Sequence, residues 1–322
     1  MSKNAAEAIV LVALIALPAL ASLYATQPAP STSSLNLSPQ PIHSTHPMVP
    51  APPGPSPQIS SAKKAEGCTL PAAQCWASIN WGGYAITNAT DSVTFVSGSW
   101  TVPAIVGAVG PKCPDTQVTW FDASTWVGID GFSNGYVEQT GTSSDCYYGQ
   151  VQYYPWYEFF PAPSYSLPSA DKIYPGDTMY AYVNYKASSS LFGIWLQDMT
   201  AHHEWTFSLT EANPGAPMDS AEWITETAAA CIPPTTCVDF EFLALTQFTS
   251  VRFSGGSATV VCPACVVPGT YTLPLSSPHW GASLQWILLV NLNWPSTPGV
   301  KAMTSAISKQ DSFDVTFVSS GP

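Results

Sequence analysis

Four short segments of the sequence combine acids, an amide and tryptophans whose chemistry suits cleavage of an amide bond. Such cleavage needs a group that activates water, a donor for the developing oxyanion and an acid for the leaving nitrogen. A glutamate can take the proton of the water and later deliver it to the nitrogen, and a glutamine amide offers N–H donors that never titrate. The segments are Trp126–Asp130 (WVGID), Glu138–Gly141 (EQTG), Trp156–Pro161 (WYEFFP) and Glu222–Glu226 (EWITE).

Residue types alone do not single out one pair in these segments. Glu222 and Glu226 lie four apart, so on a strand they share a face, and either could be a surface acid. The tryptophans could equally belong to the core. A glycan-binding or glycan-cleaving sandwich is the main alternative, because Glu138, Glu158 and Glu226 could supply the two carboxylates of a glycosidase. A binding module without activity is the third interpretation.

Other catalytic patterns are weaker. Gly131–Gly135 (GFSNG) fits G-x-S-x-G, but a nucleophile elbow needs a strand, a sharp turn and a helix. The flanks are β-like here, so we expect a glycine-rich hairpin turn. His202 and His203 are adjacent and would point to opposite faces of a strand, which argues against a shared metal ion. The D-[ST]-G signature of aspartic peptidases does not occur. We therefore expect no metal and no cofactor.

Taken in order, the four segments resemble the glutamic peptidases, also called eqolisins. That family carries a WVGIDG stretch, a QTG about ten residues further on, a WYEWYP segment and an EWIxE segment. The likeness covers roughly residues 78 to 318. Other similar segments are Asn80–Tyr84, Val96–Pro103 and Ser312–Val318.

The resemblance implies a role for each matched residue. Gln139, in the QTG, would be the catalytic glutamine, and Glu226, the second acid of EWIxE, the catalytic glutamate. For Glu226 to act as a base in acid its pKa must stay low, and we expect hydrogen bonds to its carboxylate to hold it low. The other matched positions line the family's active site and would bind or support the substrate: Trp126, Asp130, Trp156 and Glu158.

The sequence departs from the family pattern around the site. Tyr154 stands where the family often has Asp, and Phe159 stands where it has Trp. The loop from Asp130 to Gln139 is also slightly short. We therefore expect the support around the site to differ from the family's.

The elements that position these residues are predicted to be strands. Short runs rich in Val, Thr, Tyr, Phe and Trp alternate with turn residues, which is typical of a sandwich or barrel. Only Asp219–Ala230 weakly favours a helix. With the resemblance, we expect an all-β fold, an antiparallel β-sandwich (concanavalin-like jelly roll) of two curved sheets. Expected strands include Ser92–Val102, Gln117–Ile129, Gln150–Phe160, Thr178–Tyr185, Leu191–Asp198, Trp205–Leu209, Thr259–Val261, Leu284–Leu292 and Phe313–Val318.

The composition favours an acidic medium. Only 9% of the residues are charged, against roughly 25% in ordinary soluble domains. Nine Lys and Arg face 21 Asp and Glu, for a net charge of −12. No basic stripe is present to neutralise phosphates, so nucleic acid is not an expected partner. Because carboxylates are neutral in acid, a chain with few cations avoids the self-repulsion that unfolds proteins there.

Three regions are predicted along the chain. In residues 1–25, Lys3 and the apolar stretch Ile9–Leu23 indicate a signal peptide or, if uncleaved, an N-terminal membrane anchor. Residues 26–64 form a Pro/Ser/Thr-rich linker or propeptide: residues 26–62 hold ten Pro and eleven Ser or Thr, and no charged side chain. Residues 65–322 form the β-sandwich peptidase domain.

Eight cysteines behind such a leader predict disulfides in an oxidising compartment. Cys68–Cys75 and Cys231–Cys237 are the simplest local pairs, although the sequence does not fix the connectivity. Cys262 and Cys265 have the CxxC form, but neither a second pair of zinc ligands nor a redox fold accompanies them. We expect a secreted, monomeric acid endopeptidase that acts on proteins or peptides and reaches the membrane only through an uncleaved, surface-tethering anchor.

Overall fold

The computed structural model describes residues 48–49, 67–113, 120–168, 170–201, 203–231, 240–291 and 299–321, all within the unit formed by residues 37–322. These residues form β-strands and one short 3-10 helix, η1 (Ala72–Gln74), with no α-helix among them. The all-β expectation is confirmed. In this part of the chain no helix is long and apolar enough to cross a bilayer.

The first sheet carries the predicted site. Its strands lie in the order β2–β19–β3–β13–β6–β7–β8–β9, and every pair is antiparallel except β2 with β19. β5 (Trp120–Asp122) continues the line of β6 and pairs with β7. The bounds are β2 (Cys75–Ser78), β19 (Ser283–Val290), β3 (Trp81–Thr87), β13 (Ser220–Glu226), β6 (Ser124–Ile129), β7 (Val137–Tyr147), β8 (Gln150–Phe160) and β9 (Tyr165–Ser166).

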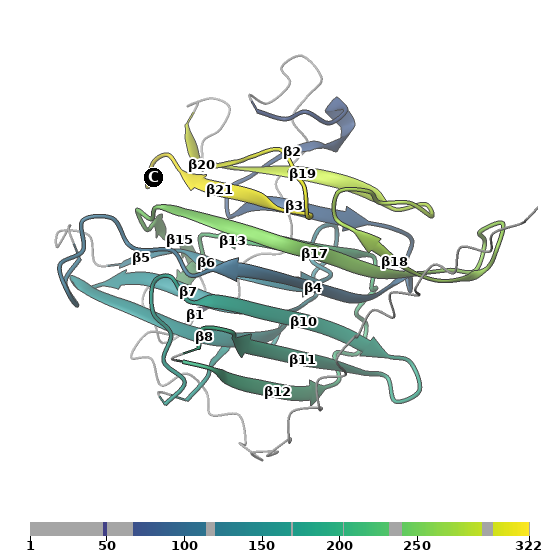
Figure 1. Cartoon of the computed structure of the whole chain (residues 1–322), viewed down its shortest axis with the longest axis horizontal. Helices are drawn as coiled ribbons and strands as arrows, with labels where there is room; N and C mark the ends of the chain where they lie inside the picture. Colours follow the sequence, from purple (N-terminus) through teal and green to yellow (C-terminus); the bar gives the residue numbers. More distant parts are fainter. Residues whose placement is uncertain are drawn as a thin grey trace, which may run out of the picture. The chain divides into compact units, whose positions relative to one another are not determined.

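The second sheet covers one face of the first. Its strands follow the order β12–β11–β10–β4–β17–β21–β20, with β18 added to β17 (Figure 1). A short antiparallel pairing of β19 with β20 joins the two sheets. The bounds are β12 (Trp205–Glu211), β11 (Leu191–Asp198), β10 (Thr178–Lys186), β4 (Val93–Thr101), β17 (Ser250–Cys262), β21 (Phe313–Phe317), β20 (Val300–Thr304) and β18 (Gly269–Pro274).

The core lies between the two sheets. β4 and β10 pack across β6 and β7 without strand pairing, and Trp100 Nε1 of β4 donates to Thr142 Oγ1 of β7 across this layer (2.9 Å). Alternate residues of both sheets point into this layer, for example Val127 and Trp223 from the first sheet and Val96 and Ala181 from the second. The arrangement is the antiparallel β-sandwich that was expected.

The weak helical expectation for Asp219–Ala230 was wrong. This segment forms β13 and the start of β14 (Ala229–Cys231). Every residue of β13 is buried, because it lies between β3 and β6 at the centre of the sheet. Glu and Ala favour helices locally, but two-sided pairing and burial outweigh that preference here.

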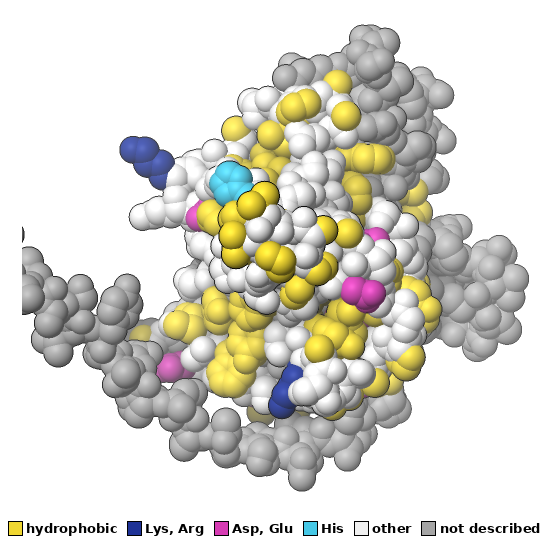
Figure 2. Space-filling view, turned by 90° about the vertical axis from the view of Figure 1, so that its right-hand side faces the viewer, with side chains coloured by type: hydrophobic (Ala, Val, Ile, Leu, Met, Phe, Trp, Pro, Cys, Tyr) yellow, Lys and Arg dark blue, Asp and Glu magenta, His cyan; other side chains and the backbone are white. Residues whose placement is uncertain are grey.

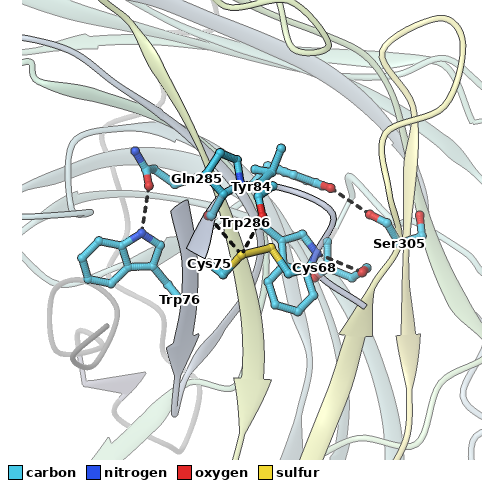
Figure 3. The surroundings of a disulfide bond; sticks show 10 residues. Cys68, Cys75, Trp76, Tyr84, Gln285, Trp286 and Ser305 are labelled. Atoms are coloured by element: carbon cyan, nitrogen blue, oxygen red, sulfur yellow. Dashed lines mark hydrogen bonds between the residues drawn. A yellow bond between two sulfur atoms is a disulfide. The ribbon is translucent and has the colours of Figure 1, made fainter. Parts of the chain in front are cut away.

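Three disulfides are present in the described part of the chain: Cys68–Cys75, Cys113–Cys146 and Cys262–Cys265. The predicted Cys68–Cys75 pair is therefore confirmed, whereas the predicted partner Cys237 lies outside the described residues. The first bond holds the edge strand β2, whose Trp76 Nε1 donates to Gln285 Oε1 of β19 (2.8 Å, Figure 3). The two cysteines of the CxxC segment, Cys262 and Cys265, form a disulfide in the β17–β18 hairpin.

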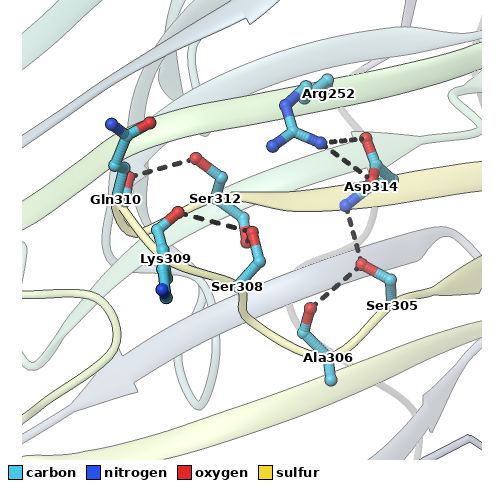
Figure 4. Close-up of polar contacts among 8 residues, drawn as sticks. All are labelled: Arg252, Ser305, Ala306, Ser308, Lys309, Gln310, Ser312 and Asp314. Carbon is cyan, nitrogen blue, oxygen red and sulfur yellow. Dashed lines mark hydrogen bonds and ion pairs between the residues drawn. The ribbon is translucent and has the colours of Figure 1, made fainter.

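Several short strands lie outside the two strand orders given above, and the surface carries few charged side chains. β1 (Met48–Val49) pairs with Ala229 and Ala230 of β14, which also pairs with β15 (Phe240–Phe242); β16 (Ala244–Leu245) runs parallel to β5. On the face shown in Figure 2, charged side chains are few and isolated. An exposed ion pair, Arg252–Asp314 (3.2 Å), joins β17 and β21 (Figure 4).

Candidate active site

The face of the first sheet turned away from the second sheet holds the predicted site residues, and we call it the site face. Because side chains alternate along a strand, the register sorts this face into three rows across β13, β6, β7 and β8. The rows are Glu222–Gly128–Gln139–Glu158, Ile224–Trp126–Gly141–Trp156 and Glu226–Ser124–Ser143–Tyr154.

Gln139 lies in the first row, on β7. Its Nε2 donates a 2.6 Å hydrogen bond to Oε2 of Glu158, the residue directly opposite on β8. Gln139 and Glu158 are each only 4% exposed. The amide oxygen of Gln139 is buried and has no partner among the described residues. One N–H of the amide is therefore occupied, and the second N–H and the oxygen remain for a bound molecule.

Glu226 lies in the third row, at the end of β13. Its Oε2 accepts a 2.8 Å bond from Nε1 of Trp126, and its Oε1 accepts a 3.3 Å bond from Nδ2 of Asn80. Trp126 itself is fully buried and packs edge-to-face on Trp81, with ring centroids 5.0 Å apart. The carboxyl is thus fixed at two points by donors that are themselves held in place.

Long side chains bring the two predicted catalytic residues together. Two strands and four residues separate Gln139 from Glu226 in the register, which puts their Cα atoms on the order of 16 Å apart. Trp126 stands between them and contacts Glu226 directly. Glu158, bonded to Gln139, acts electrostatically on Glu226, so the functional groups converge over the middle row. Shorter side chains would not reach.

Glycines make room for this convergence. A Cβ at Gly141 would lie 2.3 Å from the carbonyl oxygen of Thr125 and 2.6 Å from Cβ of Trp126. A Cβ at Gly128 would lie 3.1 Å from Cβ of Gln139. The Gly of the QTG segment therefore leaves the space that the backbone of β6 and the start of the Trp126 side chain occupy.

Burial dominates the electrostatics of the site. It raises the pKa of Glu226 to about 8, against the lowering effect of the bonds from Trp126 and Asn80. It likewise raises the pKa of Glu158 to about 8, against the bond from Gln139. The expectation that hydrogen bonds keep the Glu226 pKa low was wrong for this closed site. The bonds are present, but desolvation of a nearly inaccessible carboxylate outweighs them.

The remaining predicted residues divide into two groups. Trp156 lies on the site face between Tyr154 and Glu158, buried, and its indole N–H has no partner in the described part of the chain. Asp130 follows directly after β6. Its carboxylate accepts bonds from the backbone N–H of Met218 (2.8 Å) and Asp219 (2.9 Å), so it fastens the loop that follows β6 to the start of β13.

That loop contains the G-x-S-x-G sequence. It joins β6 to β7, as the hairpin interpretation predicted, and Ser133 Oγ donates to Asp219 rather than to a histidine. Phe132 folds back onto the site face, where it packs with Trp81 and Trp126, and its ring meets Trp76 edge-on at 5.2 Å. The loop thus covers the site and contributes to its burial.

Comparison with known proteins shows the family to which the chain belongs. Residues 79–267, more than half of the chain, match the family model described as the Peptidase A4 family. The chain belongs to the Peptidase A4 family. It is 30% identical over 199 residues to aspergillopepsin-2 of Aspergillus niger, a match that spans 56% of this chain and 64% of that protein. The chain thus covers less than two thirds of that relative.

Two solved structures share the fold of this Peptidase A4 member. One is scytalido-glutamic peptidase with a peptide-based transition-state analogue (TM-score 0.55, 23% identity, covering 74% of this chain and 98% of that chain). Another is SCP-B, a member of the eqolisin family, in complex with the tripeptide Ala-Ile-His (TM-score 0.53, 22% identity, the same coverage). At these identities the likeness establishes the fold.

Several site residues of this Peptidase A4 member were not assigned from the sequence. Asn80 was quoted only as part of an opening strand, yet its amide holds Glu226. Tyr154 was noted as a departure, and its hydroxyl donates to Asp145 (2.8 Å), a residue that no motif singled out. Glu222, fully buried in the first row, was regarded as a surface acid or a motif neighbour. Only the period-two alternation along β7 and β13 could have placed Asp145 and Glu222 on the site face.

Proposed function

We propose that this protein is an acid endopeptidase that hydrolyses peptide bonds of proteins, with Gln139 and Glu226 carrying the chemistry. The observation that supports it best is the convergence of these two side chains over Trp126, on one buried face, in a chain of the Peptidase A4 family.

Gln139 stabilises the oxyanion of the tetrahedral intermediate. Glu158 receives one N–H of its amide and thereby fixes the orientation of the other, which points to a carbonyl oxygen of the substrate. Because an amide does not titrate, the donor works throughout the acidic range. Loss of one such donor typically costs about 100- to 1,000-fold in rate.

Glu226 activates water and then protonates the leaving nitrogen. With a pKa of about 8 in the closed site, its carboxyl carries a proton at acidic pH. A bound peptide and its accompanying water add hydrogen bonds to the carboxylate, which lowers the pKa towards the working range. Glu226 then takes a proton from the water as its oxygen attacks the carbonyl carbon. The same proton passes to the nitrogen as the C–N bond breaks, so the carboxylate is regenerated.

The tryptophans and Glu158 support this chemistry. Trp126 holds one oxygen of Glu226, and Glu158 holds Gln139. The unpaired indole N–H of Trp156 is available to a carbonyl of an extended peptide. Asp130 maintains the covering loop, which must move aside for the substrate because Gln139 and Glu226 are nearly inaccessible.

The setting of the enzyme is part of the proposal. The disulfides, the low charge content and the related aspergillopepsin-2 support a secreted protein that works in acid outside the cell. Residues 1–25, as signal peptide or anchor, and most of residues 26–64, as linker or propeptide, lie outside the described residues. We propose that the peptidase domain, residues 65–322, acts as a monomer.

The test is a digest of a denatured protein from pH 2 to 7 by the wild type, Glu226→Gln and Gln139→Ala. We expect cleavage in acid only, nearly abolished in both variants, with folding checked by circular dichroism. Cleavage that persists in both variants would mean that the dyad is wrong. A two-carboxylate glycan hydrolase, the alternative function, would leave protein uncut and would keep glycan cleavage in Gln139→Ala.

A further inference from the structure

Two buried carboxyl groups on the site face have no role in the chemistry described so far. Asp122 ends β5 and Asp145 lies on β7, and both continue the site face beyond the row of Ser124, Ser143 and Glu226. They are 0% and 1% exposed. Phe121 pairs with Cys146 in the antiparallel register, so the next residues along the two strands, Asp122 and Asp145, lie opposite each other. Oδ1 of Asp145 has no hydrogen-bond partner in the described part of the chain. Two neighbouring buried carboxylates repel each other, and one proton held between them would relieve that repulsion and satisfy this oxygen.

Neighbouring groups donate hydrogen bonds to the two carboxyl groups but do not neutralise their charge. Asp122 Oδ1 accepts from the backbone N–H of Ala228 (2.7 Å), and its Oδ2 accepts from Ser124 Oγ (3.3 Å). Asp145 Oδ2 accepts from Tyr154 OH (2.8 Å). In the described part of the chain, no Lys, Arg or His side chain bonds to the pair. With one shared proton the pair carries a single negative charge in place of two.

Asp122 connects the pair to Glu226 in two ways. It anchors the chain at Ala228, two residues beyond Glu226, and it bonds Ser124, which lies directly opposite Glu226 in the register. It also acts electrostatically on the Glu226 carboxyl and opposes its ionisation. Asp122 therefore influences both where Glu226 sits and when it loses its proton.

Asp145 connects the pair to a cavity. A cavity of about 760 Å³ beside the outer edge of β8 is lined by Asp145 and Tyr154, and further by Trp120, Tyr147, Leu167 and Lys172. The reaction centre itself is closed, with Glu226 only 4% exposed. The cavity gives the carboxyl pair a route to protons that does not pass through the covering loop.

We propose that Asp122 and Asp145 form a proton-sharing pair that positions Glu226 and sets the charge it faces, with Asp145 exchanging its proton through the cavity. The proposal rests on the proposed function of Glu226. The groups that face the pair are Trp120 from β5, Glu226 from β13, Ser124 from β6, Tyr154 from β8 and, across the cavity, Asp171 and Lys172. The two residues are unequal: both oxygens of Asp122 accept other donors, whereas Oδ1 of Asp145 accepts none, so in this proposal Asp122 keeps the charge and Asp145 the proton.

That inequality gives a sharp test with amide variants. Asp145→Asn imitates a protonated Asp145, because its Nδ2 can donate to Asp122 as the shared proton does. It should leave the titration midpoint of Glu226 within about 0.2 pH units of the wild type. Asp122→Asn moves the charge away from Glu226 and weakens the Ala228 anchor. It should lower that midpoint by about half to one pH unit. The midpoint is measured from the ¹³C shift of the Glu226 carboxyl carbon, assigned with Glu226→Gln.

A second readout does not depend on catalysis. Above about pH 4 the unfolded chain has lost a proton that the folded protein keeps on this pair. The pair therefore raises the unfolding equilibrium constant of the wild type by about tenfold per pH unit in that range. Asp145→Asn should remove that contribution. Asp198→Asn is the matched control: Asp198 is a buried carboxyl of the second sheet whose Oδ1 accepts from the backbone N–H of Thr200 (2.8 Å), and its substitution should not move the Glu226 midpoint.

Two results would overturn the proposal. One is a Glu226 midpoint that falls as far in Asp145→Asn as in Asp122→Asn, since Asp145 would then carry charge and not a proton. The other is an unfolding curve of Asp145→Asn that runs parallel to the wild type from pH 4 to 8. Both are observed on folded protein without substrate, so failure of the peptidase assignment, seen in the digest, remains separable from failure of the proton-sharing pair.

Discussion

At the central strand β13, the two faces of the first sheet hold opposite kinds of residue. On β13, Ala221 and Trp223 point into the core between the sheets, whereas Glu222 and Glu226 point to the site face. On β7, the site face carries Gln139 and further polar side chains up to Asp145. One face is stabilised by apolar burial, and the other buries acids that no cation neutralises in the described interactions.

The difference shows how a fold can accommodate a destabilising site. Burial of apolar residues on the inner face offsets the free-energy penalty of burying the carboxyl groups. That cost depends on pH, because a protonated carboxyl is far cheaper to bury than a carboxylate. Burial of the site face is therefore favourable in acid and unfavourable near neutrality, whereas the apolar residues of the inner face do not titrate.

The largest expected effect is loss of the fold as pH rises. Burial raises the pKa of Asp130 to about 7 and those of Glu158 and Glu226 to about 8, all above their values in an unfolded chain. A group whose pKa is higher in the folded protein than in the unfolded chain stabilises the folded protein fully below its unfolded-state pKa, which is about 4. This contribution is lost as the pH rises to the pKa of the folded state. Each group removes about 1.4 kcal/mol per pH unit within this window.

The check is urea unfolding at pH 3, 5, 7 and 8. We expect the free energy of unfolding to be highest at the acidic end and to fall by several kcal/mol across the window of roughly pH 4.5 to 8. A flat profile, or a maximum at pH 7, would contradict the view that the site face is buried in its protonated form.

The next effect is confined to the inner face. Trp223 is fully buried, its Nε1 donates to the carbonyl of Ser97 (2.8 Å), and Gly98 leaves room for its ring. Trp223→Ala should cost about 3–5 kcal/mol of unfolding free energy at pH 3, because it opens a cavity and orphans a carbonyl. Equilibrium denaturation measures it, and Trp223→Phe, which keeps most of the volume, should lose distinctly less.

A substitution on the site face should separate activity from stability. Trp126→Phe keeps an aromatic ring beside Trp81 but removes the N–H that holds Glu226. We expect kcat/KM to fall about 10- to 100-fold, equivalent to about 1.4–2.7 kcal/mol, while the midpoint of urea unfolding at pH 3 changes little. If the fold loses as much stability as in Trp223→Ala and activity per folded molecule is retained, the two faces are not functionally distinct.

The sequence allowed part of this to be predicted. β8 and β11 were placed correctly because turn residues bound their alternating patterns, and the motifs of the family led to Gln139 and Glu226. β13 was the exception, since Glu and Ala gave it a helical bias that pairing on both sides overrides. The raised pKa of Glu226 was missed because it depends on the covering Phe132 loop and neighbouring carboxyls, which pack from distant parts of the chain. Asp122 and Asp145 carry no motif, and only the β5–β7 register joins them.

The smallest effect is expected for a charge that is exposed and paired. Arg252 on β17 meets Asp314 on β21 at 3.2 Å, with side chains 54% and 38% exposed (Figure 4). Water and salt screen such a pair, so Arg252→Ala should cost less than about 1 kcal/mol at pH 6. It should cost still less at pH 3, where acid removes carboxylate charge. Denaturation with and without 1 M salt measures it, with Asp314→Asn as the reciprocal variant. A loss above about 2 kcal/mol would show that surface pairing, and not burial of the inner face, offsets the buried acids.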